Sequence, residues 1–153
     1  MEVHLMTGTP AATNIRQRRD TTVREHIDAE NRHNPEETVA TFSSAKASYD
    51  IPAFGEAGQR PNHASVRELW VEFLAVFPDL YIEPGPIRHG DDHVFVEVQL
   101  TGTQHADWAG IPATGRSVNT RVACLYEFEQ EQLVCERVYF DFADVARQLA
   151  APS

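Results

Sequence analysis

The spacing of apolar residues changes at Pro78, and this change limits the folds that the chain can adopt. Before Pro78, apolar residues recur at the three- and four-residue intervals of an amphipathic helix, at Val66, Leu69, Trp70, Phe73, Leu74 and Phe77. After Pro78, they recur at every second residue, as along a strand with one buried face, at Val94, Val96, Val98 and Leu100. Because proline stops a helix, the sequence predicts a long helix that ends near Phe77 and a sheet that follows it.

Shorter elements surround this helix and sheet. A helix is expected from Asp20 or Thr21 to about residue 33, and a second one begins at Asn34, a good N-cap followed by a proline. The string "KASYDI" (46–51) reads as a short strand before a loop rich in Gly and Pro. Further strands are expected at 80–90, 93–103, 118–128 and 132–140, with a terminal helix at 142–150. Helices segregated over a curved antiparallel sheet give an α+β roll.

Length and periodicity predict one domain. Residues 1–19 show no sustained periodicity and are expected to form a flexible N-terminal leader. Residues 20–153 then form a single domain, because 153 residues are enough for one sizeable core and too few for two.

Charge excludes two classes of partner. The chain has 13 Lys and Arg against 23 Asp and Glu, a net charge of −10 that repels nucleic acid and anionic membrane surfaces. No apolar run is long enough to span a bilayer or to form the core of a signal peptide. Two cysteines without metal-binding spacing fit a reducing compartment. We therefore expect a cytoplasmic protein.

The last expected strand carries polar residues at alternate positions. In "ERVYFDF" (136–142) these are Arg137, Tyr139 and Asp141, which share one face of a strand. A hairpin that turns at Gln130-Glu131 pairs Tyr126 with Cys135, Val122 with Tyr139 and Thr120 with Asp141. This register predicts a mixed polar and apolar face, as in a ligand cavity.

Four strings resemble the SnoaL-like polyketide cyclase family, which shares the fold of nuclear transport factor 2 and ketosteroid isomerase. They are "FPDLYIE" (77–83), "GDDHVFVEVQLTGTQ" (90–104), "GIPATGRSV" (110–118) and "ERVYFDFADVARQLA" (136–150). The resemblance implies a cone-shaped α+β barrel, or cystatin-like roll, with an apolar pocket in each subunit of a homodimer. It also implies chemistry without metal or organic cofactor. An aspartate near the end of the last strand is the base in such cyclases, and its position corresponds to Asp141.

The residues themselves offer several candidate roles. Asp141 could take a proton next to a carbonyl group, but it is equally a good N-cap for the terminal helix. Arg137 and Tyr139 are candidate donors to an enolate oxygen, with Thr120 across the hairpin. The alternative is that Arg137 is a surface or ion-paired residue and that Tyr139 belongs to the core. Further candidate substrate-binding residues are His105, Trp108, Asp50 and Trp70, each with a simpler reading as loop, turn or core.

Three functions remain open from the sequence. The first is a cofactor-independent enzyme that cyclises by aldol addition, or isomerises, a small hydrophobic polyketide-like carbonyl compound. The second is a non-catalytic dimer that binds a hydrophobic ligand. The third is a hydrolase or dehydratase that activates water through Asp50 with His105 or Asp107. His89 and His93 bracket a hairpin tip without a third ligand, so no metal site is predicted.

Overall fold

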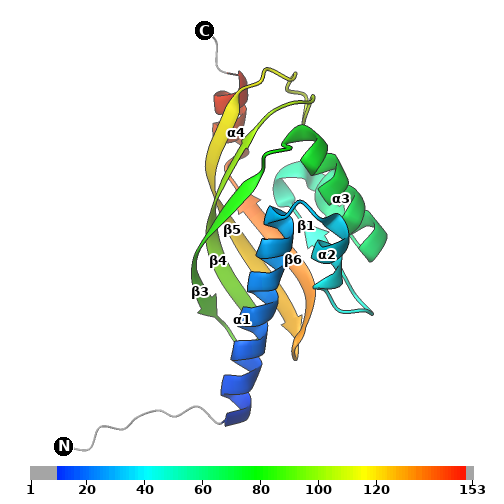
Figure 1. The fold of residues 1–153 in the computed structure, drawn as a ribbon, viewed down its shortest axis with the longest axis vertical. Helices are drawn as coiled ribbons and strands as arrows, with labels where there is room; N and C mark the ends of the chain where they lie inside the picture. Colours follow the sequence, from blue (N-terminus) through cyan, green and yellow to red (C-terminus); the bar gives the residue numbers. More distant parts are fainter. Residues whose placement is uncertain (1–9, 151–153) are drawn as a thin grey trace, which may run out of the picture.

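The computed structural model describes residues 10–150, with side chains from Asn14 onward, and shows helices packed on one side of a curved sheet (Figure 1). The helices are α1 (Pro10–Asn31), α2 (Pro35–Ala40), α3 (His63–Val76) and α4 (Phe142–Ala150), with a 3-10 segment η1 (Pro52–Gly58). The strands are β1 (Tyr49–Asp50), β2 (Gln59–Arg60), β3 (Tyr81–His89), β4 (His93–Thr103), β5 (Ser117–Glu129) and β6 (Gln132–Phe140). This arrangement confirms the predicted α+β roll.

The six strands form one sheet in the order β2-β1-β6-β5-β4-β3. Strands β3 to β6 are an antiparallel meander, whereas β1 pairs with β6 in parallel. The parallel pairing brings Tyr49, from the first third of the chain, level with Glu136 near its end. This crossover is what joins the two halves of the sequence at one place in the core.

Helix α3 forms where the three- and four-residue spacing predicted it. Its N-cap is Asn62, whose side chain accepts a hydrogen bond from the Ser65 amide at 2.9 Å while Ser65 Oγ accepts one from the Asn62 amide at 3.1 Å. This reciprocal pair is a capping box. The apolar stripe points into the core, with Val66, Leu69, Trp70 and Phe77 all buried.

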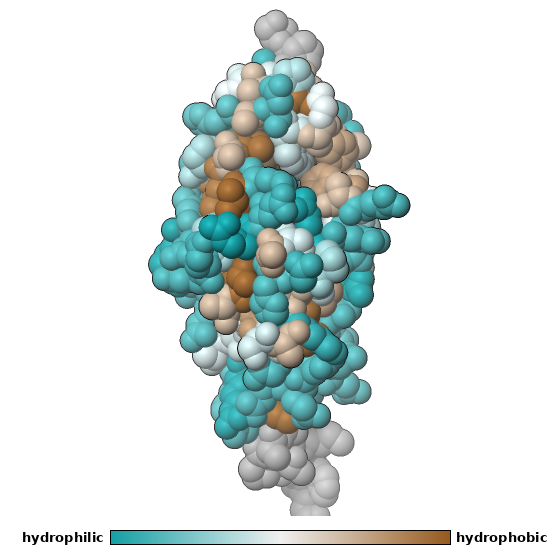
Figure 2. Space-filling view, turned by 90° about the vertical axis from the view of Figure 1, so that its right-hand side faces the viewer, coloured by the Kyte–Doolittle hydropathy of each residue, from teal (hydrophilic) through white to brown (hydrophobic). Residues whose placement is uncertain are grey.

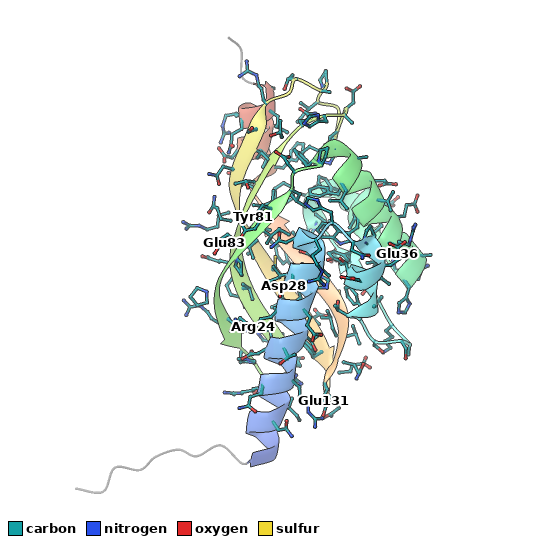
Figure 3. All side chains as sticks on the ribbon, in the orientation of Figure 1. Arg24, Asp28, Glu36, Tyr81, Glu83 and Glu131 are labelled. Carbon is teal, nitrogen blue, oxygen red and sulfur yellow. The ribbon has the colours of Figure 1, made fainter. Side chains whose placement is uncertain are left out.

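Helix α1 begins at Pro10, ten residues before the predicted start, so the expected leader is only partly outside it; residues 1–9 lie outside the described part of the chain. Arg19 attaches the N-terminal part of α1 to the sheet. Its guanidinium donates to the carbonyl oxygens of Gln130 at 2.8 Å and Asp91 at 2.9 Å, and it lies over the ring of Phe128. One arginine thus ties α1 to two hairpin turns, and Figure 3 shows Glu131 of one turn beside the helix.

The β5–β6 hairpin turns at Gln130 and Glu131, as predicted. The predicted register is correct for the first two pairs and wrong for the pairs that follow. Glu129 pairs with Gln132 and Phe128 with Leu133, after which Glu127 pairs with Cys135. Val134 is therefore an extra residue, a β-bulge, and its carbonyl oxygen accepts a hydrogen bond from the Ser48 hydroxyl at 3.0 Å.

This bulge reverses the faces of the rest of β6. Tyr126 pairs with Glu136 and Val122 with Phe140, instead of with Cys135 and Tyr139. A shift of one residue moves every following side chain to the opposite face. Alternate residues from Glu136 now face the concave side, and Arg137 and Tyr139 face the convex side.

The surface over α2 and α3 is mainly hydrophilic, and its apolar areas are small and separate (Figure 2). The two cysteines, Cys124 and Cys135, are free and buried. Within residues 10–150, no helix has both the length and the apolar composition needed to cross a membrane.

Candidate active site

A pocket lies between the concave side of the sheet and helices α1 and α3. The pocket and the open solvent at its mouth together comprise about 780 Å³ of atom-free space. Its walls are largely aromatic and aliphatic, with Phe54, Phe73, Phe77, Trp108 and Phe140 contributing rings. Such walls favour the apolar body of a small molecule.

Trp108 is fixed where the aromatic rings of η1, α3 and α4 meet. The amides of Trp108 and Ile111 each donate to the other's carbonyl oxygen, at 3.0 and 2.8 Å, across a two-residue turn in which Ala109 and Gly110 have positive φ. The indole packs 5.5 Å from the ring of Phe54, 5.6 Å from Phe77 and 5.8 Å from Phe142, measured between ring centroids. The loop therefore presents the indole in one orientation.

The polar groups of the pocket gather at one place, the carboxyl cluster, defined here as His26, Glu30, Tyr49 and Glu136. Nε2 of His26 lies 2.6 Å from Oε1 of Glu30 and 2.8 Å from Oε2 of Glu136. The Tyr49 hydroxyl donates to Oε1 of Glu30 at 3.0 Å and accepts from the indole N–H of Trp70 at 3.1 Å. All four cluster residues are buried.

Four separate elements bring the cluster together. His26 and Glu30 are one turn apart on α1, Tyr49 is on β1, and Glu136 is on β6 directly beside it. Glu30, Tyr49 and Glu136 line the pocket, whereas His26 lies behind them. Among the described residues, the second oxygen of each carboxyl group makes no hydrogen bond.

Burial and mutual attraction set the proton affinities. Burial lowers the pKa of His26, but the charges of Glu30 and Glu136 and hydrogen bonds to them outweigh burial and raise it from 6.5 to about 10. Burial raises the pKa of Glu30, and the nearby His26 only partly opposes this. Burial also raises the pKa of Tyr49 well above 10, so its hydroxyl stays neutral. At neutral pH the cluster thus has a charged imidazolium and an acid with a raised pKa.

The cluster also has the residue types of a metal site. His26, Glu30 and Glu136 place one ligand atom each within 4.8 Å of one another. The contacts of 2.6 and 2.8 Å are, however, the lengths of charge-assisted hydrogen bonds. We therefore interpret the cluster as a group that shares protons.

Three of the residues singled out in the sequence line the pocket: Trp70, Trp108 and Thr120. Trp70 holds the cluster through Tyr49. Thr120 is 7% exposed, and no hydrogen bond within the described residues occupies its hydroxyl. It is therefore a polar group in an otherwise apolar part of the wall.

Arg137 and Tyr139 do not line the pocket, contrary to the predicted hairpin register. Asp50, a candidate for a second inward carboxylate, does not line it either, because it pairs with Arg137 on β6. The Arg137 guanidinium donates to Glu127 at 2.6 Å and to Asp50, and this group lies on the convex side. Tyr139 is 47% exposed. The bulge at Val134 is the physical reason for both placements.

Asp141 is exposed and does not line the pocket. Its carboxylate accepts a hydrogen bond from the Asp144 amide at 3.1 Å, which is the predicted N-cap role. The prediction that it projects into the pocket is wrong. His105 and Asp107 are also exposed, and Asp107 accepts from the amide of Ala113 instead of joining Asp50.

His26, Glu30 and Glu136 are site residues that the sequence patterns did not single out. A signal for the first two was present, because Val23, His26, Ile27 and Glu30 follow helical spacing. A His and a Glu that continue a buried apolar stripe predict a polar pair inside the core. No comparable signal marks Glu136, because its orientation depends on the bulge.

Comparisons with known proteins agree with this fold. A profile of the SnoaL-like polyketide cyclase family matches residues 20–149. The chain superimposes on a candidate SnoaL-like polyketide cyclase from Jannaschia sp. CCS1 with a TM-score of 0.80 and 17% identity, covering 97% of this chain and 99% of that one. No curated protein sequence matches the chain.

Two further solved structures share the architecture. IdmH, a candidate polyketide cyclase from Streptomyces antibioticus, is 21% identical with a TM-score of 0.71, covering 87% of this chain and 99% of that one. A protein with a ketosteroid isomerase-like fold from Catenulispora acidiphila is 18% identical with a TM-score of 0.71, covering 86% and 93%. Because the family profile matches most of its length, the chain belongs to the SnoaL-like polyketide cyclase family.

Proposed function

We propose that the protein isomerises or cyclises a small, hydrophobic carbonyl compound by acid and base catalysis, with Glu136 as the base and Glu30 as the acid. The observation that carries the proposal is the pair of buried carboxyl groups that line one apolar pocket and share one imidazole. Two carboxyl groups in unequal environments can take opposite roles. Family membership and similarity to cyclase candidates support this class of reaction.

The reaction begins when the Glu136 carboxylate takes a proton from the carbon next to the carbonyl group. Glu30, whose pKa burial raises, gives its proton to the carbonyl oxygen, so an enol forms without a free enolate charge. Reprotonation at another carbon isomerises the compound, and attack of the enol carbon on a second carbonyl group closes a ring. Water is kept away by the aromatic walls.

The apolar part of the substrate contacts the rings of Trp108, Phe54 and Phe73 in this proposal, and Trp70 supports the cluster from behind Tyr49. Thr120 supplies a second polar contact, because its buried hydroxyl lines the same pocket. A substrate with one carbonyl group at the carboxyl cluster and another oxygen nearer Thr120 would contact both polar parts of the pocket.

The test measures uptake of deuterium next to the carbonyl group of apolar ketones in heavy water, by NMR. The panel runs from monocyclic to tetracyclic compounds and begins with β-tetralone. Glu136→Gln should slow the exchange by about a hundred- to ten-thousand-fold, the usual contribution of a positioned base. Asp141→Asn is the matched control and should exchange as fast as the wild type.

Other outcomes separate the remaining hypotheses. Full exchange in Glu136→Gln together with loss in Asp141→Asn would return the base to Asp141 and overturn the proposal. Ketones that quench the fluorescence of Trp70 and Trp108 but never exchange would identify the non-catalytic binding protein. Incorporation of oxygen from labelled water into the product would identify a hydrolase, and a product lighter than the substrate by one water would identify a dehydratase.

We further propose that the reaction needs no metal or organic cofactor. The short hydrogen bonds of the cluster support this, because His26 already uses Nε2 toward Glu136. Exchange activity should survive dialysis against a chelator and should not rise with added divalent cations. Activity that depends on a cation would instead assign the cluster to metal binding.

We also propose that the convex side of the sheet forms a homodimer. Phe95 pairs with Leu125, and Ala123 pairs with Tyr139, so these apolar side chains are neighbours on that side. Tyr139→Glu should convert a dimer to a monomer in analytical ultracentrifugation. Val71→Glu, at an equally exposed apolar residue on α3, is the control and should leave the mass unchanged.

A further inference from the structure

We propose that His26, held by Thr41, is a positioning residue that returns a proton from Glu136 to Glu30 after each half of the reaction, first at the enol stage. This inference rests on the proposed function, in which the two carboxyl groups are the base and the acid. It concerns a residue that no ligand in the pocket can reach.

His26 lies behind the carboxyl groups and not among the residues that line the pocket. Its side chain is fully buried, and a single atom, Nε2, meets both carboxyl groups, at 2.6 Å from Glu30 and 2.8 Å from Glu136. An atom placed between two carboxyl groups can take a proton from one and give a proton to the other.

Thr41 decides which nitrogen can exchange protons. The Thr41 hydroxyl donates its only hydrogen to the carbonyl oxygen of Thr38 at 2.7 Å. Its oxygen lies 2.7 Å from Nδ1 of His26 and can therefore act there only as an acceptor. Nδ1 keeps its proton, so Nε2 is the nitrogen that exchanges.

The other titratable groups around the cluster do not compete for this proton. Tyr49 faces His26 from β1, and Tyr126 faces it from β5, with ring centroids 5.6 Å apart in the latter pair. Burial raises the pKa of Tyr49, Tyr126 and Cys124 well above their usual ranges, so all three remain neutral. Glu30 on α1 and Glu136 on β6 are the remaining partners.

The proton transfer balances without any oxidant or reductant. Enol formation adds a proton to Glu136 and removes one from Glu30, which leaves the pair inverted while the enol is bound. His26 then gives its Nε2 proton to the Glu30 carboxylate, and the vacated lone pair on Nε2 accepts the proton of Glu136. Glu30 is then again the acid and Glu136 the base for the second half of the reaction, in which Glu30 protonates the new carbon or the second carbonyl oxygen and Glu136 takes the enol proton. The same exchange through His26 then restores both carboxyl groups.

The experiment compares Thr41→Val with Thr38→Val by nitrogen NMR of labelled His26. Thr38 is the matched control, because its buried hydroxyl also donates to a backbone carbonyl oxygen, that of Asn34 at 3.0 Å, without touching His26. Thr41→Val should lower the midpoint of the His26 titration by roughly one to two pH units, the effect of losing one hydrogen bond to a charged group. The alkaline limb of the kcat profile for β-tetralone exchange should move with it, and Thr41→Ser should restore both.

Two results would overturn the inference. One is a His26 that lacks a proton on Nδ1 in the wild-type protein at neutral pH. The other is a Thr41→Val titration and profile that match those of Thr38→Val, since loss of packing alone would affect both variants. The NMR titration needs no substrate, so it can fail or succeed whatever Glu136→Gln does to exchange.

Discussion

The two faces of strand β6 carry similar residue types in opposite surroundings. On the concave side, Glu136 is 3% exposed and accepts a hydrogen bond from the imidazolium of His26. On the convex side, the side chain of Arg137 is 35% exposed and donates to Glu127 and Asp50. Both faces hold ion pairs, but only one borders an apolar pocket. A polar residue in a strand is therefore evidence of a site only after its face is known.

The difference between the faces is also energetic. Charges that are removed from water must find partners, and a buried charge that loses its partner is costly. A half-exposed pair gains little, because water and ions screen it. Folding of the subunit therefore depends on each polar residue of the concave side, whereas it tolerates loss of the convex ion pairs of Arg137.

The largest effect separates the faces directly. Glu136→Leu leaves the imidazolium of His26 with one buried partner and should lower the free energy of unfolding by about 3–5 kcal/mol. Arg137→Met breaks the convex ion pairs and should cost about 0–1 kcal/mol. Urea unfolding of both variants gives the comparison, and equal losses would refute the distinction between the faces.

The sequence predicts most of the fold because its signals are local and repeated. The helix before Pro78 has six apolar residues in phase, and β4 has four residues in strict alternation. The turn at Gln130-Glu131 was also predicted correctly. Each of these patterns needs only short-range spacing, so no knowledge of tertiary contacts is required.

The site is less predictable because the orientation of its residues depends on contacts between distant segments of the chain. The first two pairs of the β5–β6 hairpin follow the predicted register, and Val134 alone then changes it. The Ser48 hydroxyl that bonds the Val134 carbonyl oxygen comes from a segment 86 residues away. Sequence spacing does not contain such a contact. The Asp141 cap, which is local, was recognised as one of two alternatives.

The pH dependence of stability should come from the concave side. The pKa of His26 is raised from 6.5 to about 10, so its stabilisation is complete below pH 6.5 and is lost as the pH rises through about 10. Glu30 acts in the same direction, because its pKa is also raised in the folded protein. Unfolding free energy should fall by up to about 1.4 kcal/mol for each pH unit in the alkaline range.

Urea midpoints across that range measure this slope. His26→Gln should flatten it, whereas Arg137→Met should keep it, because Arg137 stays charged throughout. A slope that persists unchanged in His26→Gln would assign the alkaline loss to other groups.

The smallest effect concerns Asp141, which ends the convex residues of this segment and caps α4. Asp141→Ala should lower the free energy of unfolding by about 0.5–2 kcal/mol, because the Asp144 amide loses its acceptor. Asp141→Asn should change it by only a few tenths of a kcal/mol, since asparagine caps equally well. Thermal unfolding of the two variants measures the difference. Equal stability of the two variants would show that Asp141 does not stabilise α4 as an N-cap. Loss of ketone exchange in Asp141→Asn would show that the catalytic base is Asp141 and not Glu136.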